Sequence, residues 1–507
     1  MLILAKQACQ REDHILNTTK LSLPTKLFFG SGAVGEAVYL GLFNTFITIY
    51  YNQAIGLTNT LIGTAIMLAM IGDAITDPWI GVVSDRWRSR HGRRHPFLFA
   101  APIPLAMALY AIFNPPAALT AGPEGVLQIP LFAWLAFWTI ASRALLTLYV
   151  VPHLALGGEL SKEQTQRSQL FSANTAVHYV TGASFAFIAW SFFFAEETVR
   201  ALDGQTVPGH LDAATYGPLV LTACALIIIF IWTCAAGTYK FVPILSRAEE
   251  NPPRLTVTSL LKQILSTLKN RNYIVILAGY FFFMIASGIY DTLNIFINTY
   301  LWELKPDQIR WLGLIGAPSA ALGALTSPIF MKRFDRKPVM LCALSGTVVF
   351  AQLVVNLRLL GWLPDNGDPM LMPALLANAA GFTFTLGVGT VAIMSMIGDV
   401  VDENELHTGE RQEGLFYSAR AFFAKASYSF GHFFAGIALD VFVRLPFEAV
   451  PGQLDDDILT RLAITAGPIM GLAAFISILI YSRYRLTKHR HQEILDTLKD
   501  RAKSAQT

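Results

Sequence analysis

The stretch "MIGDAITDPWIGVVSD", residues 70–85, places two carboxylates inside an apolar segment that runs from about Thr58 to Val83. A continuous apolar segment of this length predicts a helix that crosses the ~30 Å hydrocarbon core of a bilayer. An ionisable side chain at the bilayer centre costs on the order of 2.5–3.5 kcal/mol on insertion scales. Asp73 and Asp77 therefore indicate a transmembrane helix that performs a function inside the membrane.

The rest of the chain has the composition of a polytopic membrane protein. Of its 507 residues 53% are hydrophobic and only 14% are charged, and the mean hydropathy is +0.47. Soluble domains carry about 25% charged residues. The charged residues cluster between long apolar blocks, so we predict an all-α membrane protein with twelve transmembrane helices. The predicted spans are 27–51, 58–84, 96–114, 129–152, 169–194, 217–242, 272–300, 308–332, 337–360, 371–400, 412–443 and 460–485.

The distribution of basic residues predicts the orientation. Most of the 38 Lys and Arg residues fall in the two tails and the even-numbered connections. Basic residues are enriched in cytoplasmic loops, so we expect both termini in the cytoplasm of a multi-pass protein of the plasma (bacterial inner) membrane. The net charge of +3 is then a topology signal and predicts no nucleic-acid partner. The N-terminal sequence lacks the pattern of a cleaved signal peptide, and the four cysteines have no disulfide or metal spacing.

Two short turns suggest that the chain consists of two related halves. "SDRWRSRHGRRHP" follows the second predicted span, and "MKRFDRKPVM" follows the second span of the other half. Each turn combines an Asp with a basic cluster, as expected of two bundles related by duplication. The predicted organisation is a tail over 1–26, a six-helix bundle over 27–242, a cytoplasmic linker over 243–270, a second six-helix bundle over 271–485 and a tail over 486–507.

The acid pair supplies hard oxygen donors at one place on one helix. Asp73 and Asp77 are four residues apart, so they share a face and lie about 6 Å apart along the axis. Thr76 adds a hydroxyl, and Pro78 frees a backbone carbonyl one turn earlier. Such donors suit Na⁺, or a proton shared between the acids. The candidate cation site therefore consists of Asp73, Thr76 and Asp77, and Na⁺ and H⁺ both remain open.

The same acids could instead belong to structural ion pairs. Two basic residues, Lys425 and Arg143, lie inside predicted spans and could neutralise them. One lysine balances only one acid, which leaves the other available for an ion. Arg143 has a second possible role, because a buried guanidinium requires an anionic or hydroxylated partner. That partner is either a substrate or a side chain such as Glu36 or Asp73.

The basic turn resembles a motif of the major facilitator superfamily, an Asp-Arg followed by Gly-Arg-Arg. The resemblance implies a clamp between helix ends in one of two alternating states, although such turns can also serve only to fix topology. The candidate residues here are Asp85, Arg86, Arg93 and Arg94.

Three longer segments resemble the glycoside–pentoside–hexuronide:cation symporters, the melibiose-permease family. They are "DAITDPWIGVVSDRWRSRHGRRHP" at 73–96, "VPHLALGGELSKEQTQRSQL" at 151–170 and "GDVVDENELHTGERQEGLFYS" at 398–418. By composition alone the last segment is an exposed turn after the tenth helix. The resemblance adds Asp399, Asp402 and Arg411 as gate candidates.

The resemblance implies a cation-coupled sugar symporter with the major facilitator fold. In that family the second-helix acids bind the coupling cation and an eleventh-helix lysine lies beside them, which are Asp73, Asp77 and Lys425 here. The family's sugar-site residues are not reproduced, and the aligned positions carry Ala37, Val150 and Thr175. A related branch that moves lysophospholipids keeps the acids and the lysine. We therefore expect symport of a sugar or glycoside by alternating access, with a lysolipid or other amphiphile as the alternative.

Other polar residues in the spans are candidates for the substrate cavity. Asp291, Asn294 and Asn298 fall on roughly one helix face, as either a sugar-facing set or a structural hydrogen-bond ladder. Arg143 and Tyr149 complete the candidate set. We find no catalytic motif and no metal-ligand spacing, and we expect no enzyme activity and no cofactor besides the coupling ion. The expected partners of the monomer are the bilayer, a monovalent cation and a small-molecule substrate, a glycoside.

Overall fold

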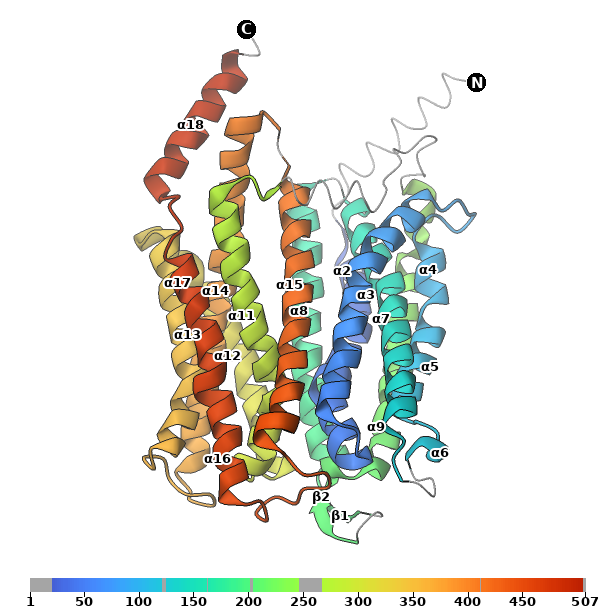
Figure 1. Cartoon of the computed structure of the whole chain (residues 1–507). Helices are drawn as coiled ribbons and strands as arrows, with labels where there is room; N and C mark the ends of the chain where they lie inside the picture. Colours follow the sequence, from blue (N-terminus) through green and yellow to red (C-terminus); the bar gives the residue numbers. More distant parts are fainter. Residues whose placement is uncertain are drawn as a thin grey trace. The chain divides into compact units, whose positions relative to one another are not determined.

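The computed structural model describes residues 21–120, 125–161, 163–200, 204–245, 267–410 and 412–504. Within these residues, twelve helices are long and apolar enough to cross a membrane (Figure 1). The number and order of the predicted spans are thereby confirmed. Most of the predicted linker, residues 243–270, lies outside the described residues.

The contacts between residues divide the chain into two units. Unit 1 comprises Met1–Leu57 and Leu68–Val257, and unit 2 comprises Thr58–Met67 and Thr258–Thr507. Each unit is described by itself below.

Unit 1 is helical except for one small hairpin. Its antiparallel strands pair Glu197 with Pro208 and Val199 with Thr206. In chain order the elements are α2 (Leu23–Ile49), η1 (Tyr50–Ile55), α3 (Asn59–Arg86, whose first turns belong to unit 2), α4 (His95–Ala100), α5 (Pro102–Ile112), α6 (Ala117–Thr120), α7 (Gln128–Glu159), α8 (Gln164–Ile188), η2 (Ala189–Phe193), β1 (Glu197–Val199), β2 (Thr206–Pro208), η3 (Gly209–Leu211), η4 (Ala213–Thr215), α9 (Tyr216–Thr238) and η5 (Tyr239–Ile244).

Within its described residues, unit 2 contains helices and connecting loops and no strand. The elements are α11 (Arg271–Phe296), η6 (Ile297–Leu301), α12 (Pro306–Arg333), α13 (Arg336–Leu359), α14 (Leu371–Thr408), α15 (Glu413–Ile437), η7 (Ala438–Val443), α16 (Asp456–Ile464), η8 (Thr465–Ile469), α17 (Met470–Tyr481) and α18 (Lys488–Ser504). The first turn of α3 is capped within this unit. The first backbone amides of a helix have no acceptor within the helix. Here the Asp440 carboxylate accepts from the amides of Asn59 at 3.1 Å and Thr60 at 2.7 Å.

Glycines let α11 and α15 approach each other closely. A Cβ on Gly288 would lie 2.3 Å from the Tyr428 carbonyl oxygen, and a Cβ on Gly431 would lie 2.4 Å from that of Ile285. Small residues at such crossings are typical of membrane helices, where association depends on close backbone packing. This contact fixes the position of α15 against α11 and hence the position of the cavity-lining residues described below.

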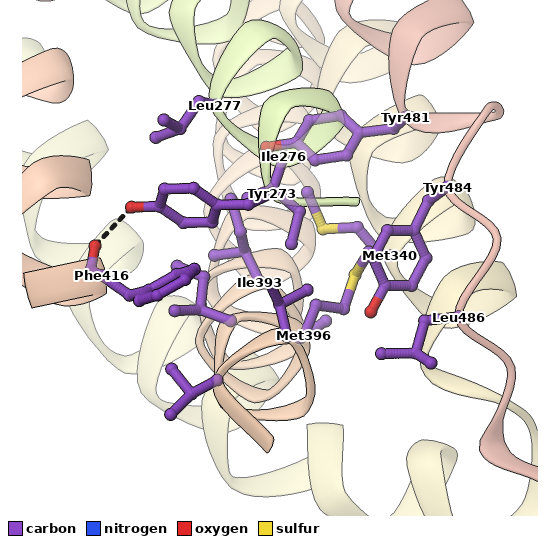
Figure 2. Packing of buried hydrophobic residues seen from close by; sticks show 14 of the residues in the cluster. Tyr273, Ile276, Leu277, Met340, Ile393, Met396, Phe416, Tyr481, Tyr484 and Leu486 are labelled. Atoms are coloured by element: carbon purple, nitrogen blue, oxygen red, sulfur yellow. Dashed lines mark hydrogen bonds between the residues drawn. The ribbon is translucent and has the colours of Figure 1, made fainter. Parts of the chain in front are cut away.

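The buried cluster of unit 2 extends to the segment that follows α17 (Figure 2). Tyr273 on α11 donates a hydrogen bond to the Phe416 carbonyl oxygen on α15. Met340 on α13 and Met396 on α14 pack into the same cluster, together with Tyr484 beyond α17. Five transmembrane helices (α11, α13, α14, α15 and α17), the chain that leads to α18 and α18 itself therefore share one core.

One expectation near the end of a helix was wrong. The acidic segment after residue 400 was predicted as an exposed turn, but α14 continues to Thr408 and ends at Gly409, whose φ of 77° is left-handed. The acids on this extension have partners on the helix surface, such as Asn270 and Asn272 for Glu403 at 3.0 Å. The predicted C-terminal tail over 486–507 contains a further helix, α18.

Candidate functional site

The acid pair of α3 lies against α7 within unit 1. Asp73 is 2% exposed, and its partner Arg143 on α7 is 7% exposed. Arg143 Nε donates to Asp73 Oδ2 at 2.9 Å, and Nη2 of the same guanidinium donates to the same oxygen. Of the partners that the sequence left open for Arg143, the structure selects Asp73. This ion pair places a positive charge beside one of the two acids.

Asp77 has a different neighbour on α7. Thr147 Oγ1 donates to Asp77 Oδ1 at 2.8 Å. Arg143 and Thr147 are four residues apart, as are Asp73 and Asp77, so α3 and α7 run parallel with matched turns. The Thr76 hydroxyl lies 3.5 Å from the Asp73 carbonyl oxygen within α3. The three residues of the predicted cation site therefore lie on consecutive turns beside Arg143 and Thr147.

The neighbourhood of Arg143 is held by buried aromatic and hydroxyl groups. The hydroxyls of Tyr39 and Ser142 lie 2.7 Å apart, and both residues are fully buried. Tyr149 is also fully buried and stacks on His153 with a centroid distance of 5.2 Å. A Cβ on Gly32 would lie 2.1 Å from the Tyr149 hydroxyl. Tyr149 is an interior residue of unit 1, and its place in a substrate cavity stays a prediction.

The second predicted polar set lies on α11 and η6 in unit 2. The Tyr428 hydroxyl donates to Asp291 Oδ2. Asp291 lines a cavity of about 120 Å³ together with Tyr290, Gln352 and Phe382. Asn298, 7% exposed, donates to Asn294 Oδ1 at 3.5 Å, which favours the hydrogen-bond ladder for these two residues.

A second cavity of unit 2 adjoins the first. It has a volume of about 150 Å³ and shares Phe283, Thr347 and Leu386 with its neighbour. Arg420 on α15 is its charged lining residue. Lys425, predicted beside the acid pair, lies on the same helix and is half-buried; its placement beside the acids stays a prediction.

The gate candidates of unit 1 form one cluster at the end of α3. Arg94, 5% exposed, donates to Ser84 Oγ at 2.7 Å, and its Nη2 pairs with Asp85. Arg94 Nε and Arg93 Nη2 each lie 2.9 Å from Glu159 Oε1. Arg86 is exposed. Glu159 was missed as a site residue, although the quoted "GGEL" motif contains it.

Unit 2 carries a related cluster at the end of α14. Arg336 Nη1 lies 2.9 Å from Asp399 Oδ2, and its Nε donates to Ser395 at 2.8 Å. His491 on α18 lies 2.9 Å from Asp402 Oδ2. Arg411 lies outside the described residues. In both units an Arg that follows the second transmembrane helix pairs with an acid near the end of the fourth. This shared arrangement supports the internal repeat.

Residues 28–488 match the model of a family described as "MFS/sugar transport protein". The chain belongs to the glycoside–pentoside–hexuronide:cation symporter family of the major facilitator superfamily. Members of this family are multi-pass membrane transporters. Within the described residues no group of three or more His, Cys, Asp or Glu side chains could hold a metal ion.

Two relatives and one solved structure illustrate the similarity. "Uncharacterized symporter sll1374" of Synechocystis sp. is 24% identical, over 96% of this chain and 98% of its own. "Glucuronide carrier protein homolog" of Escherichia coli is 23% identical, over 96% of this chain and 98% of its own. The crystal structure of the nucleoside transporter NupG superposes with a TM-score of 0.58 at 14% identity, over 91% of this chain and 100% of its own, and shares the fold.

Proposed function

We propose that the protein is a secondary active symporter that couples a monovalent cation, Na⁺ or H⁺, to the movement of a sugar or glycoside. The observation that carries the proposal is that both acids of α3 lie on consecutive turns against polar side chains of α7. Arg143 brings a full positive charge to Asp73, whereas Thr147 brings a neutral hydroxyl to Asp77. A buried carboxylate favours a nearby positive charge. Asp73 and Asp77, with the Thr76 hydroxyl beside them, are therefore the ligands that we assign to the coupling cation.

Cation and substrate binding are coupled through the shape of this region. A cation at Asp77 changes the charge that faces α7, and Arg143 and Thr147 transmit that change to the helix. If the cation increases the affinity for the substrate by some factor, the substrate must increase the affinity for the cation by the same factor. The ends of the units that carry Asp85 and Asp399 face the cytoplasm in this proposal, together with both termini, in the plasma membrane.

The substrate class follows from the family and one named relative. A relative is named a glucuronide carrier homolog, which supports a sugar derivative as the solute. The cavities of unit 2 are lined mainly by apolar and aromatic side chains, such as Phe283, Tyr290 and Phe382. This lining favours a solute with an apolar group, and it keeps an amphiphile such as a lysolipid as the second candidate.

Transport by purified protein in sealed liposomes tests the proposal. Labelled methyl glycosides and lysophospholipids are offered with an inward Na⁺ gradient, an inward H⁺ gradient or neither. We expect concentrative uptake of a glycoside with one gradient only, and its loss in Asp77→Asn. Asp365→Asn, a change at an exposed loop carboxylate, is the matched control and keeps full uptake. Gradient-independent accumulation, or accumulation by Asp77→Asn at the wild-type level, would contradict the proposal.

A further inference from the structure

Arg420 is an arginine of unit 2 whose described neighbours are a thioether and an aromatic ring. It lies on α15 and is half-buried. Its Nη1 donates to the Met394 sulfur at 3.4 Å, and its guanidinium carbon lies 5.0 Å from the centroid of the Tyr280 ring. Among the described residues, no carboxylate lies within ion-pair distance of it. A thioether and a ring face leave most of its five N–H donors without a strong acceptor.

The guanidinium borders a cavity of unit 2. The cavity of about 150 Å³ is lined by Arg420, Tyr280, Phe283, Met340 and Met394, among others. The nearby hydroxyl of Thr390 donates within its own helix, to the Leu386 carbonyl oxygen at 2.9 Å. The one strong positive charge of this lining therefore faces a space large enough for a small chemical group.

Placing a cation in such surroundings costs free energy unless an anion pairs with it. Desolvating a charge without a partner is strongly unfavourable. A planar guanidinium binds a carboxylate or a similar oxyanion through two parallel hydrogen bonds. In unit 1 the buried Arg143 has such an anionic partner, because it pairs with the carboxylate of Asp73. The lining of the unit 2 cavity supplies no such acid, so the anion has to come from a bound molecule.

We propose that Arg420 binds the carboxylate or sulfonate group of an anionic organic solute, with Tyr280 and Phe283 against its apolar faces. This inference rests on the proposed function, because the solute is the transported one. Arg420 and Tyr428 are eight residues apart, which is about 12 Å along α15. Asp291, bonded to Tyr428, lines the adjoining cavity, and in this proposal it accepts hydroxyls from another part of the solute.

Equilibrium binding to the purified full-length protein tests this site without any ion gradient. The probes are methyl β-D-glucuronide, the neutral methyl β-D-glucoside and inorganic phosphate, each titrated with and without Na⁺. We expect wild-type protein to bind the glucuronide about tenfold or more tightly than the glucoside. Arg420→Gln reduces that ratio to about one, and Arg420→Lys retains part of it, because a lysine keeps the charge but loses the bidentate geometry. Arg333→Gln, at an exposed arginine, keeps the wild-type ratio.

The outcomes separate this inference from the proposed function. A wild-type protein that binds the two glycosides equally, or an unchanged ratio in Arg420→Gln, overturns the role of Arg420. Phosphate that displaces the glucuronide at equal concentration shows a free-anion site and also overturns it. If Arg420→Gln does not fold, Arg420→Lys and Tyr280→Leu provide the readout, and an unchanged ratio in both overturns the inference. Failure of the proposed function has a different signature, namely uptake that is indifferent to both ion gradients.

Discussion

Arg143 on α7 directs two guanidinium N–H groups to the same oxygen, Oδ2, of Asp73 on α3. One turn further along both helices, Thr147 donates to Asp77. Two carboxylates that are equivalent in the sequence pattern are therefore unequal in the folded unit. One belongs to a buried ion pair with α7, and the other accepts from a neutral hydroxyl of the same helix. This inequality predicts that the two acids respond differently to substitution.

Substituting each of the two acids by asparagine should distinguish its effect on the stability of the fold from its effect on cation-coupled uptake. Asp73→Asn leaves the buried Arg143 without its carboxylate, and breaking a buried pair costs about 3–5 kcal/mol. Asp77→Asn retains an oxygen that accepts from Thr147, so its thermal unfolding midpoint should fall less than that of Asp73→Asn. Both variants should lose ion-dependent uptake. Thermal unfolding in detergent and gradient-driven uptake in liposomes measure the two effects.

A double variant provides the control for this prediction. Asp73→Asn with Arg143→Gln removes both charges of the pair, so it should recover most of the midpoint lost in Asp73→Asn alone. Equal midpoints in Asp73→Asn and the double variant would show that the ion pair does not govern stability. Full coupled uptake in Asp77→Asn would remove that residue from the cation site.

The sequence predicts those features of the site that depend on one helix alone. The spacing of Asp73 and Asp77 places them on one face, and the apolar length around them predicts a span. The partner of Arg143 could not be predicted, because it depends on how α7 is rotated against α3. The sequence pattern carries no signal for that rotation. The same reason applies to Tyr149, which turned inward against the space left by Gly32.

Contacts between distant segments account for the error at the end of α14. Arg336 and His491 are separated by 155 residues, yet both lie beside Asp399. With these partners, the acidic end of α14 stays helical to Thr408. The basic clusters were visible in the sequence as turns. Their acid partners, Glu159 above all, were visible only as parts of a family motif.

The cluster at the end of α3 predicts a loss of stability on removal of its shared acid. Glu159 accepts from both Arg93 and Arg94. Because Arg94 is buried, Glu159→Gln should cost about 3 kcal/mol, the lower end for a broken buried pair. Glu163→Gln, at an exposed acid four residues later, is the matched control and should have no measurable effect. Equal midpoints for the two variants would show that the cluster contributes nothing to stability.

The burial of His210, which follows the β1–β2 hairpin of unit 1, predicts that the free energy of unfolding falls at acid pH. His210 is fully buried between rings such as Trp190, at a centroid distance of 5.1 Å, and burial lowers its pKa to about 3. The unfolded chain binds a proton near pH 6.5, but the folded chain does so only near pH 3. Between these values the unfolded state holds more protons, so stability falls as the pH falls, by roughly 1.4 kcal/mol per unit.

Two histidine variants test this pH dependence. His210→Phe removes the group that titrates differently in the two states, so the slope of the unfolding midpoint between pH 6.5 and pH 4 should become shallower. His407→Phe changes an exposed histidine at the end of α14 and should leave the slope unchanged. A slope in His210→Phe that equals the wild-type slope would assign the acid sensitivity to other groups.

The contacts of α18 predict that it can be released by one substitution. Ile494 is 2% exposed and belongs to the unit 2 core, and Arg501 donates to the Leu406 carbonyl oxygen at 2.7 Å. Ile494→Asp would bury a carboxylate among apolar side chains, so α18 should undock and its backbone become accessible. Limited trypsin digestion should then cleave at Arg490 or Arg501 at least tenfold faster than in the wild type, a shift of ~1.4 kcal/mol in the docking equilibrium. Gln492→Asp, at an exposed position of the same helix, should leave the rate unchanged; equal rates in all three proteins would mean that the side chain of Ile494 does not hold α18 in place.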